Sequence, residues 1–225
     1  MGQKISVDFL RSRKRLSNTT NNSAPATELQ RSVWFAKGKS YAKLLKQDIA
    51  IREFIKKELR AAGLVEIVIR RYFKKLEIVI FVTKPGVVIG KMGATINKLK
   101  DDLVKLFGLQ RDFKLEISEY KNPLGSSNVI AMEISDALKK GLPYRRIAKG
   151  FIEKLKSTGV LGAKICIKGR LNGGDIARKE DFIIGSVPRQ TIRAGIDFAL
   201  VHAQTRTGII GVKVWLYKGD KFKNY

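Results

Sequence analysis

The most constraining stretch of this chain spans residues 84–98 and is built around two glycines. Gly90 and Gly93 enclose Lys91 and Met92, so the loop carries a cation directly after its first glycine. Glycine allows sharp turns and close approach of another backbone, and free N–H groups at a helix start suit phosphate. The stretch therefore predicts a loop that clamps a nucleic-acid backbone, with Lys91 on a phosphate. Apolar residues at helical spacing follow the loop: Ile96, Leu99, Leu103, Leu106 and Phe107.

The segments around this loop have the alternating pattern of strands. Polar and apolar residues alternate over 64–71 and 76–83 before the loop, and a third strand-like run, 113–118, follows the helix. The resulting order is strand, strand, helix, loop, helix, strand. It resembles the prokaryotic type of KH domain, which grips nucleic acid through a Gly-X-X-Gly loop. A Gly-X-X-Gly match alone is weak, so this context supports the interpretation.

A phosphate-binding P-loop is the main alternative for the same glycines. That motif needs four residues between its glycines and a Ser or Thr after its Lys. Here three residues separate Gly86 from Gly90, and Met92 follows Lys91. Met92 cannot hold a magnesium ion as a hydroxyl does, so we reject nucleotide hydrolysis and expect no cofactor.

The chain is long enough for about two domains and is strongly basic. Its 225 residues include 45 Lys and Arg against 20 Asp and Glu, a net charge of +25. Basic residues outnumber acidic ones in residues 1–60, 61–120 and 121–225 alike, so the charge is not confined to one tail. Such a charge destabilises a compact state unless a polyanion neutralises it. Nucleic acid is therefore the expected partner, with a membrane surface as a distant second.

Cys166 and His202 are the only cysteine and histidine, which excludes an internal disulfide and a zinc site of the usual kind. A Cys–His nucleophile pair is conceivable, but such residues in apolar, strand-like segments are more often packing residues. Without paired carboxylates in a recognisable motif, we expect neither an enzyme nor a small-molecule substrate. We also expect no metal and, without an apolar run of about 20 residues, no membrane span. The N-terminus lacks a signal-peptide core, although its basic residues also fit an organelle-targeting segment.

Composition divides the chain into four parts. Trp34 and Phe35 are expected to anchor the first part to the second, which opens with a helix over 41–62. The four parts are a basic N-terminal arm with a flexible insert (1–40), a KH type II RNA-binding domain (41–120), a turn-rich linker (121–127) and a C-terminal α+β domain (128–225).

Two helices followed by four strands make up the predicted C-terminal domain. The helix patterns cover 128–140 and 144–157, and Pro143 stands where its missing N–H costs nothing. Alternation in the strands predicts a mostly antiparallel sheet with both helices on one face. The fold class is therefore α+β, with a three-stranded sheet and helices first and this domain second. The four strand-like runs are Lys164–Leu171, Asp181–Val187, Ile196–His202 and Ile209–Tyr217.

A cationic stripe runs along the helix predicted over 144–157. A projection at about 100° per residue separates an apolar side from a basic side. An ordinary solvated face is the plain alternative, but in so basic a chain two adjacent arginines favour an RNA contact. The apolar side carries Tyr144, Ile147, Phe151 and Leu155, and the basic side carries Arg145, Arg146, Lys149 and Lys156, of which the first three form the predicted messenger-facing stripe. Further expected RNA contacts are Lys4, Lys164, Lys168, Arg170, Arg178 and Lys179.

Several separate motifs, in order along the chain, resemble one family. They are Met1–Lys4, Ser32–Ala36, Lys84–Lys91, Lys168–Arg178 and Gly208–Lys218. Through them the chain resembles the bacterial-type ribosomal protein S three family of the small subunit across nearly its full length. The family usually continues after its first four residues with His-Pro and a Gly-Phe-Arg stretch, whereas this chain has Ile-Ser-Val-Asp-Phe and an Asn/Ser insert.

This resemblance implies a structural component of the small-subunit head, bound to small-subunit ribosomal RNA near the messenger RNA entry. It implies contacts with ribosomal proteins S ten and S fourteen and an entry channel shared with S four and S five, in the cytoplasm or in an organelle. In the family a basic cluster faces incoming messenger and supports its unwinding without ATP, and that cluster matches Arg145, Arg146 and Lys149. A free-standing KH-domain regulator of RNA is the alternative, which the spread of charge over both domains disfavours.

Overall fold

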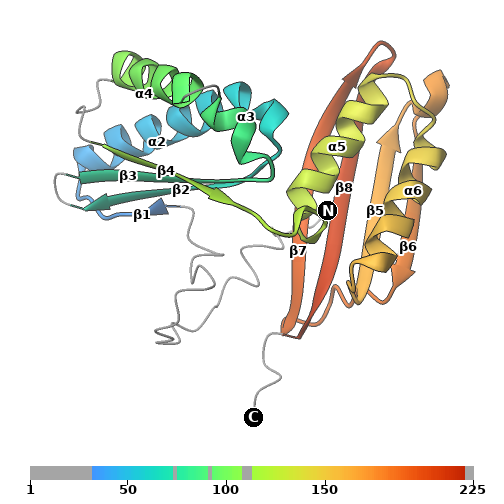
Figure 1. The fold of residues 1–225 in the computed structure, drawn as a ribbon. Coiled ribbons are helices and arrows are strands. Elements are labelled where there is room, and N and C mark those ends of the chain that lie inside the picture. Colours follow the sequence, from blue (N-terminus) through green and yellow to red (C-terminus); the bar gives the residue numbers. More distant parts are fainter. Residues whose placement is uncertain (1–31, 73–74, 91–92, 108–112, 221–225) are drawn as a thin grey trace. The chain divides into compact units, whose positions relative to one another are not determined.

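The computed structural model describes residues 32–72, 75–90, 93–107 and 113–220. The chain passes from one compact unit to a second between Lys121 and Asn122. Figure 1 shows the elements of each unit. Lys4, Lys91 and Met92 lie outside the described residues, as does most of the predicted arm. Within the described ranges, no helix is both long and apolar enough to cross a membrane.

The first unit is a sheet with helices. Its elements are β1 (Ser32–Val33), α2 (Lys39–Glu58), a 3-10 turn (Arg60–Ala62), β2 (Leu64–Tyr72), β3 (Lys75–Val82), α3 (Pro85–Ile89), α4 (Ala94–Phe107) and β4 (Lys114–Glu119). The strands lie in the order β1-β2-β3-β4, with β2 and β3 antiparallel and the outer strands parallel to their neighbours. The predicted order of strands, helices and loop is confirmed. Sequence reasoning missed β1, because two residues are too few to show a period.

One hydrophobic core lies between this sheet and helices α2 and α4, which Figure 1 shows on the same side of the strands. Leu99 and Leu103 of α4 are buried in it, as their helical spacing predicts. The same prediction was wrong for Leu106, which is 61% exposed because it projects at the edge of the apolar face. The sheet and α2 contribute Ile67, Ile69, Ile78, Ile80, Ile51 and Ile55.

The second unit consists of two helices and one antiparallel sheet. Its elements are a 3-10 turn (Pro123–Gly125), α5 (Ser127–Lys139), α6 (Tyr144–Ser157), β5 (Gly162–Gly169), a 3-10 turn (Leu171–Gly173), β6 (Arg178–Gly185), β7 (Ala194–Thr205) and β8 (Gly208–Asp220). The strand order is β6-β5-β8-β7, and every pairing is antiparallel. Two helices and four strands are therefore confirmed. The predicted bounds of β6 were wrong, since pairing with β5 starts at Arg178 and stops at Gly185.

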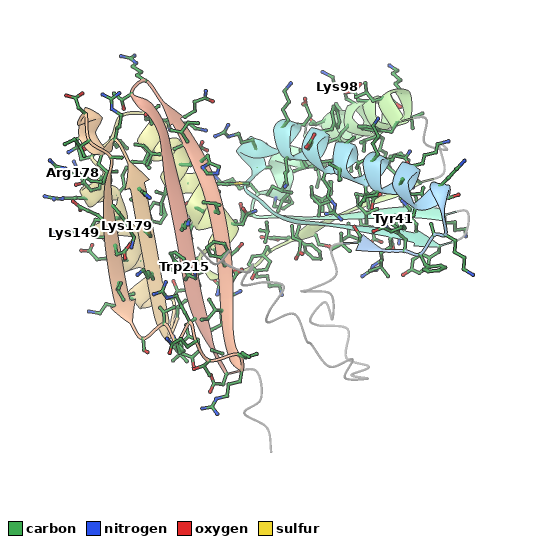
Figure 2. The ribbon with its side chains drawn as sticks, turned by 180° about the vertical axis from the view of Figure 1, so that it is seen from behind. Tyr41, Lys98, Lys149, Arg178, Lys179 and Trp215 are labelled. Carbon is green, nitrogen blue, oxygen red and sulfur yellow. The ribbon has the colours of Figure 1, made fainter. Side chains whose placement is uncertain are left out.

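Helices α5 and α6 cover one face of this sheet (Figure 1). Ile165 and Ile167 point to the helices together with their neighbours Val214 and Val212 on β8. Figure 2 looks at the sheet from behind, where Trp215 lies. On that face, which no helix of the described residues covers and which is called the uncovered face below, a smaller buried cluster is formed by Cys166, Ala194, Ile196 and Trp215, with Val187, Phe198 and Tyr217 packed against it.

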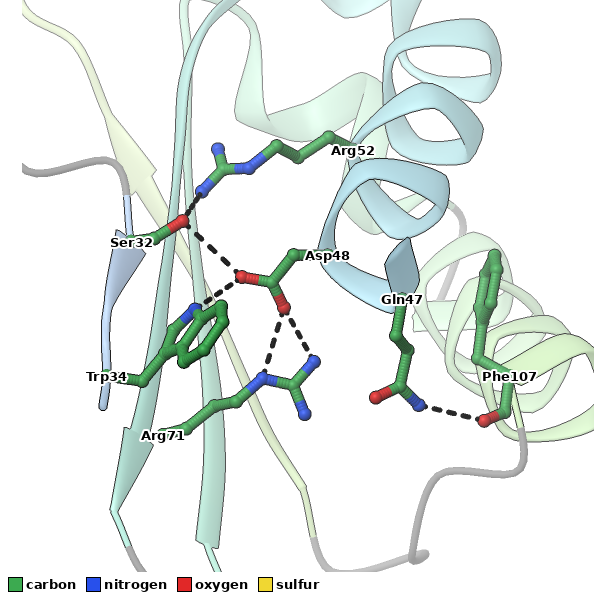
Figure 3. A network of polar contacts seen from close by, with 7 residues as sticks. All are labelled: Ser32, Trp34, Gln47, Asp48, Arg52, Arg71 and Phe107. Carbon is green, nitrogen blue, oxygen red and sulfur yellow. Dashed lines mark hydrogen bonds and ion pairs between the residues drawn. The ribbon is translucent and has the colours of Figure 1, made fainter. Parts of the chain in front are cut away.

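A buried carboxylate ties β1 to the first unit. Asp48 on α2 is 1% exposed and accepts two hydrogen bonds from Arg71, at 2.6 and 3.1 Å. It also accepts one from Trp34 Nε1 at 2.7 Å and one from Ser32 Oγ at 3.4 Å (Figure 3). Trp34 thus anchors the chain as predicted, whereas the prediction was wrong for Phe35, which is 81% exposed. The helical spacing over 41–62 places Asp48 in line with the apolar residues, but it cannot reveal this network, because the donors lie on other segments.

Candidate nucleic-acid interface

Helix α6 carries the predicted stripe. It begins directly after Pro143, and its apolar residues Tyr144, Ile147 and Leu155 are buried against the sheet core. The side chains of Arg145, Arg146 and Lys149 are exposed. The projection therefore separates the two sides of α6 correctly. A helix fixed by its apolar side leaves its cations available to a polyanion.

Arg145 forms a clamp with Glu180 of β6. Its Nη2 donates to Glu180 Oε1 at 2.8 Å and its Nε donates to Oε2 at 3.2 Å, while the Tyr144 hydroxyl donates to Oε1 at 2.7 Å. The hydrogen bond from Arg145 lowers the pKa of Glu180, and the bond to Glu180 raises the pKa of Tyr144. Sequence spacing gave no signal for this pair, because Glu180 lies on another element.

The adjacent Arg146 lies about 100° further around α6, on the side of the helix towards the end of α5. It lines a groove beside the end of α5, together with Lys154 of the same helix. Lys149 follows Arg145 by one turn of α6 and so lies on Arg145's side of the helix, and Figure 2 labels Lys149 and Arg178 at the same edge of the unit. Arg178 shares the helix-facing side of β6 with Glu180, two residues further on. The predicted stripe is therefore divided between two sides of α6: Arg145 and Lys149 lie on the side towards β6, and Arg146 lies on the side towards α5.

Lys164 was predicted to contact RNA, but it lies on the uncovered face of the sheet and is only 8% exposed. Its Nζ donates to Asp181 Oδ2 at 2.8 Å and lies 6.0 Å from the centre of the Trp215 ring. Burial alone would raise the pKa of Asp181, but hydrogen bonds from Lys164, Cys166 and Lys179 outweigh it and the net shift is downward. These contacts give Lys164 a structural role in the sheet.

Lys168 and Lys179 stand directly opposite each other on β5 and β6, and both are exposed. Like charges in that position repel and destabilise the pair of strands. Asp181 relieves part of the repulsion through an ion pair with Lys179 at 2.9 Å. The pair faces away from the helices, so it belongs to a different surface from the α6 stripe.

Arg170, another predicted RNA contact, holds the loop after β5. Its guanidinium donates to the carbonyls of Gly174 at 3.0 Å and Thr207 at 3.3 Å, and to Asp175 Oδ1 at 3.0 Å. Its side chain is still 43% exposed. Arg170 is therefore a loop-fixing residue that keeps a solvent-facing edge.

The two loop glycines have the backbone that only glycine adopts easily. Gly90 has φ of +71° and Gly93 has φ of +78°. A Cβ on Gly90 would stand 2.2 Å from Thr95 Oγ1 and 3.2 Å from the Thr95 nitrogen. Helix α4 begins at Ala94, directly after the second glycine. Both glycines that flank the loop therefore have positive φ, and the second leads directly into a helix start, whereas the two residues between them lie outside the described residues.

Cys166 and His202 form no nucleophile pair. They lie on β5 and β7 with β8 between these strands, and the register places Leu200, not His202, level with Cys166, so the two residues are more than about 10 Å apart. Burial raises the pKa of Cys166, which is the reverse of an activated thiol. Cys166 is a packing residue as predicted, whereas the prediction was wrong for His202, which is exposed. Among the described residues, no group of acidic, Cys or His side chains could hold a metal.

Comparison with known proteins decides the family. The sequence matches the KH domain over residues 50–124 and the family described as ribosomal protein S3, C-terminal domain, over residues 134–216. It is 39% identical over 199 residues to small ribosomal subunit protein uS3c of Guillardia theta, covering 88% of this chain and 92% of that protein. This chain belongs to the small ribosomal subunit protein uS3 family.

Two further uS3 relatives support the assignment. The protein of Persephonella marina is 39% identical over 191 residues, covering 85% of this chain and 84% of its own length. That of a Sulfurovum species is 42% identical over 189 residues, covering 84% and 81%. The family and the α+β fold predicted from the sequence are confirmed. As a uS3-family chain with a KH domain, the protein is a ribosomal, RNA-binding protein of translation.

Proposed function

We propose that this uS3-family chain is a structural, non-enzymatic constituent of the small ribosomal subunit. It binds small-subunit ribosomal RNA in the head and helps to form the messenger RNA entry channel. Its neighbours there are ribosomal proteins S ten and S fourteen, with S four and S five sharing the channel. The relatives' names support the placement in the small subunit, and the net charge of +25 supports a polyanionic partner.

The arrangement of α6 carries the messenger-binding part of this proposal. Its apolar side is buried in the sheet core, while Arg146 and Lys149 are exposed on the far side. Their charges are therefore free for phosphates of a passing strand. Arg145 contributes through its clamp with Glu180, which fixes the first turn of α6 on β6. The helix contacts messenger and helps to unwind it, and ribosome translocation supplies the free energy, so this protein consumes no ATP.

The Gly90–Gly93 loop and the opposed pair Lys168 and Lys179 are the proposed contacts to ribosomal RNA. The loop has positive φ at both glycines and leads into the start of α4. Repulsion between Lys168 and Lys179 falls when a phosphate binds between them, which favours that site in an RNA complex. Arg170 and Arg178, which belong to the second unit like Lys168 and Lys179, complete the proposed contacts.

Co-sedimentation tests the proposal against the free-standing regulator. Tagged full-length protein is expressed, and lysates are separated on sucrose gradients in high-magnesium buffer. We expect the tagged chain in the small-subunit peak, and we expect it to remain there after a moderate salt wash. A regulator would appear in light fractions with free RNA, and that result would refute a ribosomal role.

A further inference from the structure

A groove beside α6 is lined by Arg146 together with residues that the proposed messenger contact does not use. It has a volume of about 400 Å³ and lies between α6 and the end of α5 with the turn that follows. Its apolar lining comes from both sides, with Ile147 buried and Leu142 51% exposed at the rim. The lining residues are Ala137, Leu142, Arg146, Ile147, Gly150, Phe151 and Lys154.

Two cations flank the apolar part of the groove. Arg146, Gly150 and Lys154 follow one another at intervals of four residues, so they lie in one row along α6. The Cα atoms of Arg146 and Lys154 are therefore about 12 Å apart along the helix axis, with Gly150 between them. Lys154 Nζ also lies 5.2 Å from the centre of the Phe151 ring. The seven lining residues include no carboxylate.

Gly150 is unusual at the centre of this row. Glycine in a helix interior is about 1 kcal/mol less favourable than alanine. Nothing lies within 4 Å of the place where its Cβ would stand, and its backbone is helical, so packing does not require glycine there. The missing side chain leaves the groove open between the two cations.

An apolar, aromatic-containing floor between two cations matches one nucleotide of a single strand. A base offers a flat apolar face for the ring of Phe151, and its flanking phosphates offer charge to Arg146 and Lys154. A duplex cannot use such a groove, because its bases are already stacked and paired. A partner protein's helix could fill the apolar floor, but it would need acidic residues to match both cations.

We propose that this groove receives one unstacked base of single-stranded RNA. Arg146 and Lys154 hold the adjoining phosphates, and Gly150 gives the base room to approach Phe151. The inference rests on the proposed messenger contact and adds to it a reason for preferring unpaired strands. A base held here would be unavailable for pairing, which favours the open form of a hairpin.

Filling the groove tests this proposal without changing any charge. Full-length protein, Gly150→Leu and Gly150→Ala are titrated into fluorescently labelled short oligouridine and into an abasic strand of equal length. The abasic strand keeps the phosphates and lacks the bases. Wild-type protein should bind oligouridine about tenfold more tightly than the abasic strand, within the range for one base stack. Gly150→Leu should lose most of this preference, Gly150→Ala should lose part of it, and abasic affinity should change less than twofold.

Gln204→Leu is the matched control, since it adds a leucine at an exposed position of β7 on the uncovered sheet face. It should keep the full preference. Circular dichroism should show both Gly150 variants folded, because each replaces glycine by a better helix former. Equal wild-type affinity for the two strands, or an unchanged preference in Gly150→Leu, would overturn the groove proposal. Failure of wild-type protein to bind either strand would instead refute the proposed messenger contact.

Discussion

Arg145 and Glu180 are joined by two hydrogen bonds, from Nη2 at 2.8 Å and from Nε at 3.2 Å, across the gap between α6 and β6. The neighbouring Arg146 lies on the side of the helix towards α5 and lines the groove beside α6. Two adjacent arginines that look equivalent in the sequence therefore have different roles. One positions the helix, and the other faces the solvent and any strand that approaches.

Replacing Arg145 or Glu180 tests this division. Arg145→Ala should lower the thermal unfolding midpoint slightly, and Glu180→Ala should lower it more, because it also leaves the Tyr144 hydroxyl without its acceptor. The double variant should be no worse than Glu180→Ala alone, because both substitutions lose the same Arg145–Glu180 pair. Arg146→Ala should leave the midpoint unchanged. Purely additive midpoint shifts would show that the pair contributes nothing of its own.

The same variants should separate in RNA binding. Each phosphate contact to a single strand contributes about 0.7 to the slope of log K against log salt. Arg146→Ala and Lys149→Ala should each lower the slope by about that amount, and Arg145→Ala should lower it less. Glu180→Gln should strengthen binding, because it removes a negative charge beside the stripe and releases Arg145. Equal slope changes for all three cations would contradict the division of labour.

Asp48 is predicted to be the most sensitive polar residue in the first unit. Asp48→Asn removes the charge that neutralises Arg71 and weakens the bonds from Trp34 and Ser32. Removing one partner of a buried ion pair costs about 3 kcal/mol or more, and urea unfolding followed by circular dichroism would measure it. Asp101→Asn is the control, because Asp101 is exposed on α4 of the same unit. A loss below about 1 kcal/mol for Asp48→Asn would contradict the structural role of this network.

Asp181 makes the stability of the second unit depend on acid pH. Its pKa is lower in the folded protein than in the unfolded chain. Below the usual carboxyl range the unfolded chain therefore binds a proton that the folded protein does not bind. The free energy of unfolding should be constant above that range and fall as the pH drops through the window towards the folded pKa. Urea midpoints of Asp181→Asn should be lower at neutral pH and show a weaker acid dependence, and an unchanged dependence would refute this assignment.

Variants of the Gly90–Gly93 loop distinguish the role of its backbone from the role of its charge. Gly90→Ala should destabilise the first unit by about 1 kcal/mol or more, because φ is positive and the new Cβ would meet Thr95. Gly86→Ala is the control, since Gly86 is helical and has open space around its Cβ position. Replacing Lys91 and Met92 by two aspartates should leave unfolding unchanged and weaken RNA binding by on the order of 1 kcal/mol per charge. Unchanged binding would leave the loop as a feature of the fold alone.

Periodicity was sufficient to predict most of the helices and strands and their order along the chain, but not the order of the strands within each sheet. Helix α6 has a proline before its first turn and a clear apolar side, so its bounds and its exposed cations followed from local pattern. The predicted burial of Leu106 was wrong because a residue at the edge of an apolar face can point either to the core or to the solvent. Strand β1 was missed because two residues are too few to show a period, and because the hydrogen bond from Ser32 to Asp48 of α2 is a contact that no local pattern reveals.

Long-range contacts determine which cations are buried or paired, and the local sequence pattern does not show these contacts. Lys164 alternates with isoleucines and looks like a solvent-facing strand residue. It is buried because Val187 and Trp215 pack on that face and Asp181 from β6 pairs with it. Arg145 likewise looks like a stripe residue until Glu180, on a strand that follows, is brought beside it. Each of these partners lies on an element that only the tertiary fold brings close.

We propose above that the exposed side of α6 acts on messenger in the small subunit. The most direct measurement compares translation of a messenger with a stable hairpin and one without, using ribosomes that carry Arg146→Ala and Lys149→Ala together. Both substitutions leave the buried side of α6 intact, so assembly into subunits should be normal. We expect the hairpin messenger to be translated several times more slowly than with wild-type ribosomes, while the unstructured messenger keeps its rate. Equal relative rates on the two messengers would contradict the claim.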